Sequence, residues 1–142
     1  KPFTLFKFRT MRRETRSVAS HLADPKMITK FGSFLRKTKL DEIPQLWNVF
    51  LGDMSLVGPR PCLFNQEELV EARKVKNIFA VRPGITGLAQ ISRIDMSPPQ
   101  LLAEVDAKMI QAMTFRHYFK YLIVTVTGGG QGDAARHHPL ND

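Results

Sequence analysis

Apolar residues recur at helical spacing in several parts of the chain, and short segments rich in proline, glycine and charge separate them. A first helix is predicted from Met27, because apolar residues follow at steps of three and four: Ile28, Phe31, Phe34 and Leu35. A second helix is predicted over residues 41–51, with Asp41 at or beside its N-cap and Pro44 in its first turn, where a missing N–H has no cost. Its expected apolar side consists of Leu46, Trp47 and Phe50. A third helix is predicted over residues 66–78.

The longest helical pattern begins near Ser97. Ser97 and Gln100 have the spacing of a capping box, and Pro98 stands at the first helical position. Apolar residues then keep helical spacing for several turns: Leu101, Leu102, Val105, Met109, Ala112, Phe115, Phe119 and Leu122. We therefore expect one long helix that ends before Gly128, followed by a flexible tail over residues 128–142.

Short strands and loops occupy the remaining segments. Residues 2–11 are rich in aromatic side chains and threonine, which predicts a strand with Lys7 and Arg9 on one face. Residues 12–26 have the polar composition of a mobile loop, and residues 52–62 the proline and glycine content of a rigid one. A second such loop over residues 81–88 is expected to lead into a short strand at residues 88–91. The pattern predicts a mainly helical α+β domain over residues 1–127.

Composition adds an uneven distribution of charge. The 142 residues are 43% hydrophobic, enough for one domain with its own core, and carry a net charge of +8. Residues 1–39 hold 11 of the 21 Lys and Arg residues but only two acidic ones. Such a segment indicates an anionic partner, whether nucleotide phosphate, nucleic acid or lipid head groups, unless it is simply a solvated basic face. The single Cys62 forms no internal disulfide, and no stretch has the length and hydropathy of a transmembrane helix.

The strongest candidate chemistry lies at Asp41 and Glu42, two adjacent carboxylates that closely follow three basic residues, Arg36, Lys37 and Lys39. A carboxylate beside a positive, phosphate-binding surface can attack phosphorus as a nucleophile. Adjacent carboxylates also suit Mg²⁺, which takes one or two of them together with substrate phosphate oxygens. The alternative is a capped helix with an acidic first turn.

Two arginines stand in stiff loops. Arg60 lies between Pro59 and Pro61, so its backbone has little freedom and its guanidinium can present a planar set of donors to a phosphate. Arg82 precedes Pro83 and a glycine in the same manner. Each could also be an ordinary exposed loop arginine. Phosphate-binding P-loops, dinucleotide fingerprints and metal-ligand spacings of His and Cys are missing from the sequence.

Four segments in order make the pattern specific: Lys-Phe-Arg-Thr-Met at residues 7–11, Leu-Asp-Glu-Ile-Pro-Gln-Leu-Trp-Asn-Val at 40–49, Gly-Asp-Met-Ser-Leu-Val-Gly-Pro-Arg-Pro at 52–61 and Arg-Pro-Gly-Ile-Thr-Gly at 82–87. The chain resembles the bacterial sugar transferases, which are monotopic polyprenyl-phosphate phosphoglycosyl transferases. The resemblance extends from residue 1 to about residue 127. It implies a single compact domain that lies on a membrane surface.

The resemblance also implies an activity. A sugar-1-phosphate moves from a UDP-sugar to polyprenyl (undecaprenyl) phosphate with release of UMP, through a covalent aspartyl-phosphosugar intermediate on Asp41. Glu42 is then expected to bind Mg²⁺, and Arg36 and Arg60 to bind phosphate oxygens. The further phosphate- or substrate-binding residues that we expect are Lys7, Arg9, Arg82, Pro59 and Pro61. The product initiates a bacterial surface glycan such as O-antigen, capsule or exopolysaccharide, or a glycoprotein glycan. An N-acetylated hexosamine or a deoxysugar is the donor sugar we expect.

The same resemblance implies a location and partners. We expect the protein to act at the cytoplasmic face of the bacterial inner membrane, on an anionic lipid surface. We expect no nucleic-acid partner, and a homodimer is one assembly that the resemblance allows. Members of the family carry an N-terminal hydrophobic segment that dips into the membrane; it is not part of these residues, so we expect the sequence to be an N-terminally truncated piece. Two other classes stay open: a basic nucleic-acid-binding module, supported by the aromatic residues within the basic segment, and a non-catalytic scaffold on the membrane surface.

Overall fold

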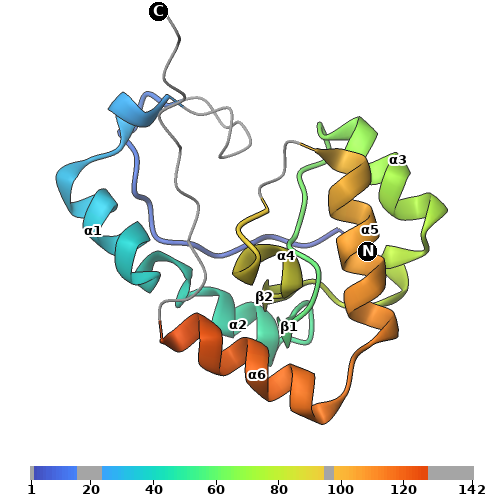
Figure 1. Cartoon of the computed structure of the whole chain (residues 1–142). Helices are drawn as coiled ribbons and strands as arrows, with labels where there is room; N and C mark the ends of the chain where they lie inside the picture. Colours follow the sequence, from blue (N-terminus) through green and yellow to red (C-terminus); the bar gives the residue numbers. More distant parts are fainter. Residues whose placement is uncertain (1, 16–23, 95–97, 128–142) are drawn as a thin grey trace, which may run out of the picture.

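A computed structural model describes residues 2–15, 24–94 and 98–127 of the chain (Figure 1). The structure is α+β and mainly helical, as the sequence predicts. Its helices, 3₁₀ turns and strands follow in the order η2 (Pro25–Met27), α1 (Lys30–Thr38), η3 (Leu40–Glu42), α2 (Gln45–Phe50), β1 (Ser55–Val57), α3 (Glu67–Val75), η4 (Ile78–Ala80), β2 (Gly84–Thr86), α4 (Leu88–Ile91), α5 (Pro99–Gln111) and α6 (Phe115–Val126).

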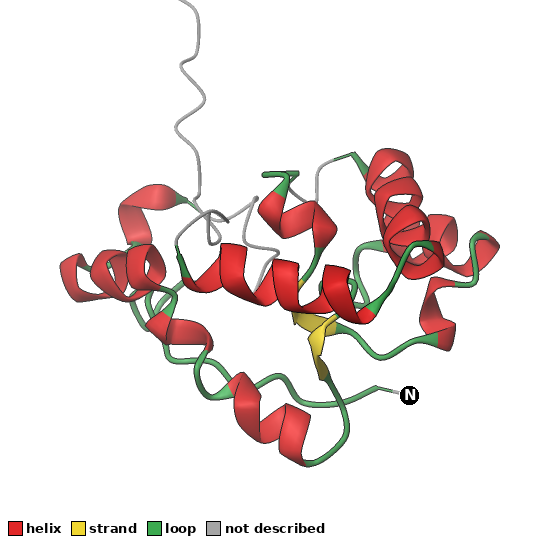
Figure 2. Ribbon diagram, turned by 60° about the horizontal axis from the view of Figure 1, so that its bottom comes forward, coloured by secondary structure: helices red, strands yellow, loops and turns green. Residues whose placement is uncertain are grey.

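A small parallel sheet lies at the centre of the molecule, with helices around it (Figure 2). Strands β1 and β2 pair with Ser55 opposite Gly84 and Val57 opposite Thr86, and the crossover between them contains α3 and η4. The pairing continues past β1, because the Gly58 N–H donates to the Thr86 carbonyl at 2.8 Å. The two backbones approach so closely here that a Cβ on Gly84 would collide with Gly58. Both strands lie within segments that the sequence pattern predicts as loops.

The apolar core belongs to the C-terminal part of the described chain. Helix α6 covers the sheet, where Tyr121 packs with Val57 and Met109. Helices α3, α4 and α5 meet around a second cluster formed by Leu69, Ala89 and Leu102. Figure 1 shows α3 and α5 side by side, with α6 running beneath the sheet. These contacts provide a rigid support on which the loop after β1 can be held.

The N-terminal segment is extended but is not the strand that the sequence predicts. Its first residues bond to a side chain: the Phe6 N–H donates to Asn48 Oδ1 at 3.0 Å, and Asn48 Nδ2 donates to the Thr4 carbonyl at 2.7 Å. The side-chain amide thus replaces a neighbouring strand. The bridge between Met11 and Ile28 is the one ladder pairing of this segment in the described part of the chain.

The predicted helix over residues 41–51 is in fact two elements. Leu40 to Glu42 form the 3₁₀ turn η3, and α2 begins only after Pro44, which is its N-cap residue. Asp41 therefore lies inside a separate turn and is not the N-cap of α2. Proline stops the helix from extending backward, because its ring and missing N–H favour only the start of a helix. The helix ends before Gly52, whose φ of 80° suits a residue without Cβ.

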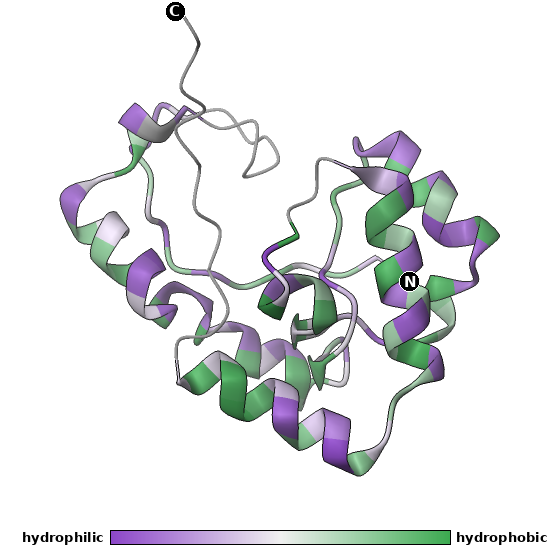
Figure 3. Ribbon diagram, viewed as in Figure 1, coloured by the Kyte–Doolittle hydropathy of each residue, from purple (hydrophilic) through white to green (hydrophobic). Residues whose placement is uncertain are grey.

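The apolar side chains of α1 and α2 point mainly outward. Phe31 and Phe34 on α1 are 69% and 54% exposed, and Trp47 and Phe50 on α2 are 55% and 78% exposed. The buried residues of α2 are the polar Gln45 and Asn48. Figure 3 shows apolar and polar positions alternating along these helices and along α6. The apolar side of α2 that the sequence predicts is therefore exposed. None of the helices in the described ranges has the length and apolar character needed to span a bilayer.

The C-terminal helical pattern also divides. Residues 88–91 form helix α4 instead of the expected strand, and the long predicted helix is interrupted at Ala112, the C-cap of α5. A new helix starts at Thr114, whose hydroxyl accepts the His117 N–H at 3.2 Å. The break turns α6 back onto the sheet, which one continuous helix could not reach. The expected cap at Ser97, most of the predicted loop at 12–26 and the tail at 128–142 lie outside the described residues.

Candidate active site

The acid pair is buried in the turn η3. Asp41 is 3% exposed and Glu42 is 8% exposed. The turn follows Lys39, which has a positive φ of 58° and whose carbonyl accepts the Glu42 N–H at 3.1 Å. A left-handed residue reverses the chain direction at the end of α1. The two carboxylates are thus directed inward, although they lie on a short turn between two helices.

Lys7 reaches both carboxylates from the extended N-terminal segment. The Phe8 N–H donates to the Asp41 carbonyl at 3.0 Å, which fixes the segment beside η3. Lys7 Nζ then lies 3.1 Å from Asp41 Oδ2 and 3.7 Å from Glu42 Oε1. The ion pair with Asp41 is partly shielded from water, so its attraction is screened less than that of a surface pair.

Arg60 reaches the same carboxylate from the loop after β1. Its Nη2 lies 3.3 Å from Glu42 Oε1. Residues 59–61, here called the 59–61 loop, are anchored because the Pro59 carbonyl accepts the Gly84 N–H at 2.8 Å. The motif around Gly84 therefore holds the loop that carries Arg60. Pro61 completes this loop, and both prolines restrict the backbone beside the arginine.

Arg36 lies in the last turn of α1, just before η3. Its Nε donates to Thr10 Oγ1 at 2.8 Å, and Thr10 is itself buried. The Thr10 carbonyl accepts the Thr29 N–H at 3.0 Å, so the N-terminal segment is also joined to the start of α1. Arg36 is thus held at the junction of three elements that surround the acid pair.

Lys39, the residue before η3, has a shifted titration. Its burial lowers the pKa of the ammonium below the ordinary value, because the charged form loses solvation. Glu42 opposes this shift, and the positive charge of Arg60 adds to it. The balance shows that Glu42 and Arg60 both act on the electrostatics at Lys39.

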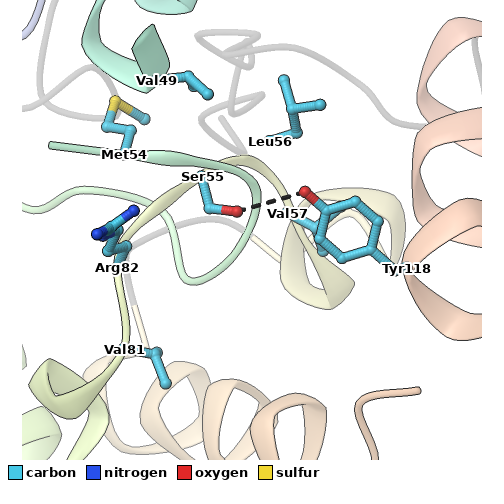
Figure 4. A pocket seen from close by; sticks show the side chains of 8 residues that line it. All are labelled: Val49, Met54, Ser55, Leu56, Val57, Val81, Arg82 and Tyr118. Atoms are coloured by element: carbon cyan, nitrogen blue, oxygen red, sulfur yellow. Dashed lines mark hydrogen bonds between the residues drawn. The ribbon is translucent and has the colours of Figure 1, made fainter. Parts of the chain in front are cut away.

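The structure does not group Arg82 with the acid pair. Arg82 is exposed and lines an open pocket of about 520 Å³ beside β1, together with Ser55, Tyr118 and apolar side chains (Figure 4). The hydroxyls of Ser55 and Tyr118 are 3.4 Å apart in this pocket. Arg9 is exposed on the N-terminal segment. The predicted residues that come together around the acid pair are therefore Lys7 and Arg60, with Arg36 beside them.

The donor set is compatible with Mg²⁺. The described residues contain no group of three or more His, Cys, Asp and Glu side chains that could enclose a metal ion. A magnesium ion needs less than that, since it commonly binds one or two carboxylates and completes its shell with water and phosphate oxygens. Asp41 and Glu42 provide two adjacent carboxylates of this kind.

Three buried polar residues that support the site do not emerge from the sequence pattern. Asn48 is fully buried, and Arg73 and Asp106 form a buried ion pair with Arg73 Nη2 2.7 Å from Asp106 Oδ2. A signal was present for the pair: Arg73 is four residues after Leu69, and Asp106 four after Leu102, so both interrupt apolar helix faces with opposite charges. For Asn48, the three-residue spacing from Gln45 indicates a polar helix face, but it does not indicate that this face is buried.

Known proteins resemble this chain over most of its length. A sequence model of the family described as "Bacterial sugar transferase" matches residues 1–130. The chain is 42% identical to the "Uncharacterized sugar transferase EpsL" of Bacillus subtilis (strain 168), across 89% of this chain and 62% of that protein. It is 35% identical to the "UDP-glucose:undecaprenyl-phosphate glucose-1-phosphate transferase" of Caulobacter vibrioides, across 88% of this chain and 50% of that protein. It is 34% identical to the "Galactosyl transferase CpsE" of Streptococcus agalactiae serotype III, across 87% of this chain and 30% of that protein. The chain thus spans less than two thirds of the length of these relatives.

Proposed function

Because this chain belongs to the bacterial sugar transferase family, we propose that it transfers a sugar-1-phosphate from a UDP-sugar to polyprenyl phosphate, such as undecaprenyl phosphate, with release of UMP. The product initiates a bacterial surface glycan. The observation that carries the proposal is the buried pair of Asp41 and Glu42 against the cations of Lys7 and Arg60. A relative named for glucose-1-phosphate transfer to undecaprenyl phosphate supports the class of reaction.

In the proposed reaction, Asp41 is the nucleophile. A carboxylate oxygen of Asp41 attacks the phosphorus that carries the sugar, and a new oxygen–phosphorus bond forms. The bond from that phosphorus to the bridging oxygen breaks, and UMP leaves with the electron pair. An oxygen of the polyprenyl phosphate then attacks the same phosphorus, which forms the lipid-linked product and restores the Asp41 carboxylate.

The cations beside the acid pair can guide the diphosphate to Asp41. The side chains of Lys7 and Arg60 are 23% and 21% exposed, whereas those of Asp41 and Glu42 are 4% and 10% exposed. An incoming phosphate therefore meets the cations first. Lys7 can exchange its contact with Asp41 for one with a phosphate oxygen, which uncovers the nucleophile. Arg36 adds positive charge at the same junction, and Arg9 and Arg82 remain predicted phosphate contacts.

Glu42 and Asp41 can hold Mg²⁺ together with the donor. When bound, the ion offsets the negative charge of the diphosphate and of the leaving UMP. Glu42 is more than a candidate metal ligand, because its Oε1 also accepts a hydrogen bond from Arg60. This bond connects the 59–61 loop to η3. Arg60 supplies planar, directional donors for phosphate oxygens.

The proposed place of action is an anionic membrane surface at the cytoplasmic face of the bacterial inner membrane. The aromatic side chains of α1 and α2 are exposed, and α6 has Phe115, Phe119 and Ile123 on one face, at 88%, 58% and 62% exposure. Exposed apolar faces beside a basic segment are typical of proteins that bind the interfacial region of a bilayer. A homodimer stays a prediction.

The test measures UMP release by the full-length protein in membranes, with Mg²⁺, undecaprenyl phosphate and single UDP-sugars. Asp41→Asn has the same shape but no nucleophilic carboxylate, so we expect its rate to fall at least about 1,000-fold. Asp24→Asn, a change at an exposed aspartate, is the matched control and should keep the wild-type rate. A labelled phosphosugar adduct on Asp41 should appear in the wild type only.

Other outcomes point to the alternatives. An Asp41→Asn protein with full activity would show that the nucleophile lies elsewhere. A wild type that releases no UMP but binds vesicles would favour the scaffold, and salt-sensitive binding of oligonucleotides that survives Asp41→Asn would favour a nucleic-acid-binding module. The donor panel includes UDP-glucose and UDP-galactose as well as the expected N-acetylated and deoxy sugars, because named relatives transfer glucose or galactose.

A further inference from the structure

Helices α3 and α5 share a buried ion pair that the proposed reaction does not use. Arg73 is 2% exposed and Asp106 is 1% exposed. Arg73 Nε and Nη2 both donate to Asp106 Oδ2, at 3.0 Å and 2.7 Å. Burying two charges costs solvation energy, and apolar residues of similar volume are often as stabilising or more so. Cohesion between the two helices is therefore a weak reason for placing this pair in the core.

The third contact of Arg73 suggests a different reason. Arg73 Nη1 donates to the backbone carbonyl of Arg60 at 2.7 Å. This is the residue whose guanidinium lies 3.3 Å from Glu42. The preceding carbonyl, that of Pro59, is bound by the Gly84 N–H. The 59–61 loop is thus held at two successive carbonyls, one bound from β2 and one from α3.

The two prolines make this anchoring effective. Pro59 and Pro61 have fixed φ angles, and a residue that precedes a proline has a restricted backbone. With the carbonyl of Arg60 fixed as well, its backbone has little freedom, and the point from which its side chain extends toward Glu42 is set. Asp106 fixes the plane of the Arg73 guanidinium, because two donors of that guanidinium bind one carboxylate oxygen.

We propose that Arg73, oriented by Asp106, is a positioning residue that holds the 59–61 loop so that Arg60 meets Glu42 and the donor phosphate. The inference rests on the proposed transferase function and adds two residues to its machinery, neither of which touches the reacting atoms. Loss of the Arg73 contact leaves Arg60 present but displaced. A displacement of about 1 Å at a reacting centre can cost about 100-fold in rate.

The variants separate positioning from general stability. Arg73→Lys keeps the charge and can still pair with Asp106, but it lacks the planar fork that also reaches the Arg60 carbonyl. We expect kcat/KM for UMP release to fall about 10- to 100-fold. The protein should stay folded, because the buried Asp106 keeps a cationic partner. Lys74→Met, a change at an exposed neighbour on α3, should leave kcat/KM and Tm unchanged.

A double-mutant cycle with Arg60→Ala gives a readout that a purely structural role would not move. If Arg73 acts through Arg60, Arg73→Lys has little further effect on kcat/KM once Arg60 is Ala, although its effect on Tm persists. If the two losses in kcat/KM multiply, Arg73 acts by general stability and the proposal is overturned.

A crystal structure of the Arg73→Lys protein tests the same idea without activity. The positioning role predicts that Arg60 leaves Glu42, whereas an unchanged contact between Arg60 Nη2 and Glu42 Oε1 overturns it. The position of Arg60 can be compared between the two proteins even if the wild type releases no UMP from any donor. In that case the proposed function fails, and the crystal structure alone decides whether Arg73 positions Arg60.

Discussion

At the scale of single residues, the site depends on charges brought together at one turn. Lys39 shows that this grouping costs solvation of a charge, because it is partly buried and lies near both Glu42 and Arg60. It also adopts a positive φ. Its burial lowers the pKa of the ammonium relative to the unfolded chain, where the value is about 10.5. Between the lowered pKa and the ordinary one, the unfolded chain binds more protons than the folded protein.

This difference predicts a pH-dependent stability. Since the unfolded state binds more protons in that window, the free energy of unfolding should rise as pH increases through it, and the contribution should level off above 10.5. Lys39→Met should remove this component of the slope. Urea unfolding at several alkaline pH values measures it, with Lys37→Met as a control for the loss of an exposed charge. Equal slopes for wild type and Lys39→Met would contradict the prediction.

At the scale of elements, the N-terminal segment is fixed by a side chain instead of a sheet. Asn48 is completely buried and spans two backbone groups of the extended segment, at Phe6 and Thr4. This arrangement, together with the bond from Phe8 to Asp41, places Lys7 on the acid pair. Helix α2 therefore serves the site through its polar face.

Replacement of Asn48 should loosen the segment. Asn48→Leu has a similar volume but leaves the Phe6 N–H and the Thr4 carbonyl without their partner, so we expect the free energy of unfolding to fall by about 2 kcal/mol. Amide hydrogen exchange at Phe6 should become faster. Asn48→Asp keeps an acceptor for Phe6 but sets an oxygen against the Thr4 carbonyl, so it should also destabilise.

The comparison needs an asparagine that makes no such bonds. Asn65 is exposed in the loop before α3, and Asn65→Leu should change neither the unfolding free energy nor exchange at Phe6. If Asn48→Leu were as stable as Asn65→Leu, the amide bridge would not be what holds the segment.

At the scale of the whole molecule, the polar and apolar parts are arranged unequally. In the described chain up to residue 51, the buried polar and charged residues are Thr10, Asp41, Glu42, Gln45 and Asn48, whereas Leu35 is the one hydrophobic side chain classed as core. The apolar core lies around α3 to α6. The N-terminal half thus has a polar interior and exposes both aromatic and basic side chains, a combination that suits contact with a bilayer interface.

The exposed aromatic residues of α2 should therefore control binding to membranes. Removing them in the double variant Trp47→Ser, Phe50→Ser should weaken binding of the full-length protein to phosphatidylglycerol-containing vesicles at least about tenfold, since each ring loses a favourable transfer from water. Their rings stack at 5.2 Å and are already exposed, so Tm should change little. Vesicle flotation measures the binding.

The same change to serine at another exposed apolar side chain provides the control. Val75 is the last residue of α3 and is 81% exposed, and Figure 1 shows α3 on the opposite side of the molecule from α1. Val75→Ser should leave vesicle binding unaltered. Undiminished binding by the α2 double variant would mean that another surface meets the membrane.

The sequence by itself determined the helical and α+β character, the concentration of positive charge, and the motifs that contain Asp41, Glu42 and Arg60. These are properties of spacing and composition within a few turns of chain. The tertiary structure decided which face of α2 is buried and that Thr4 and Phe6 bond to Asn48. It also decided where the C-terminal helix breaks and that Arg73, paired with Asp106, binds the carbonyl of Arg60. Periodicity defines the two faces of a helix but not their direction, and the partner of a buried polar group can lie more than 40 residues away, as it does for Phe6 and Asn48.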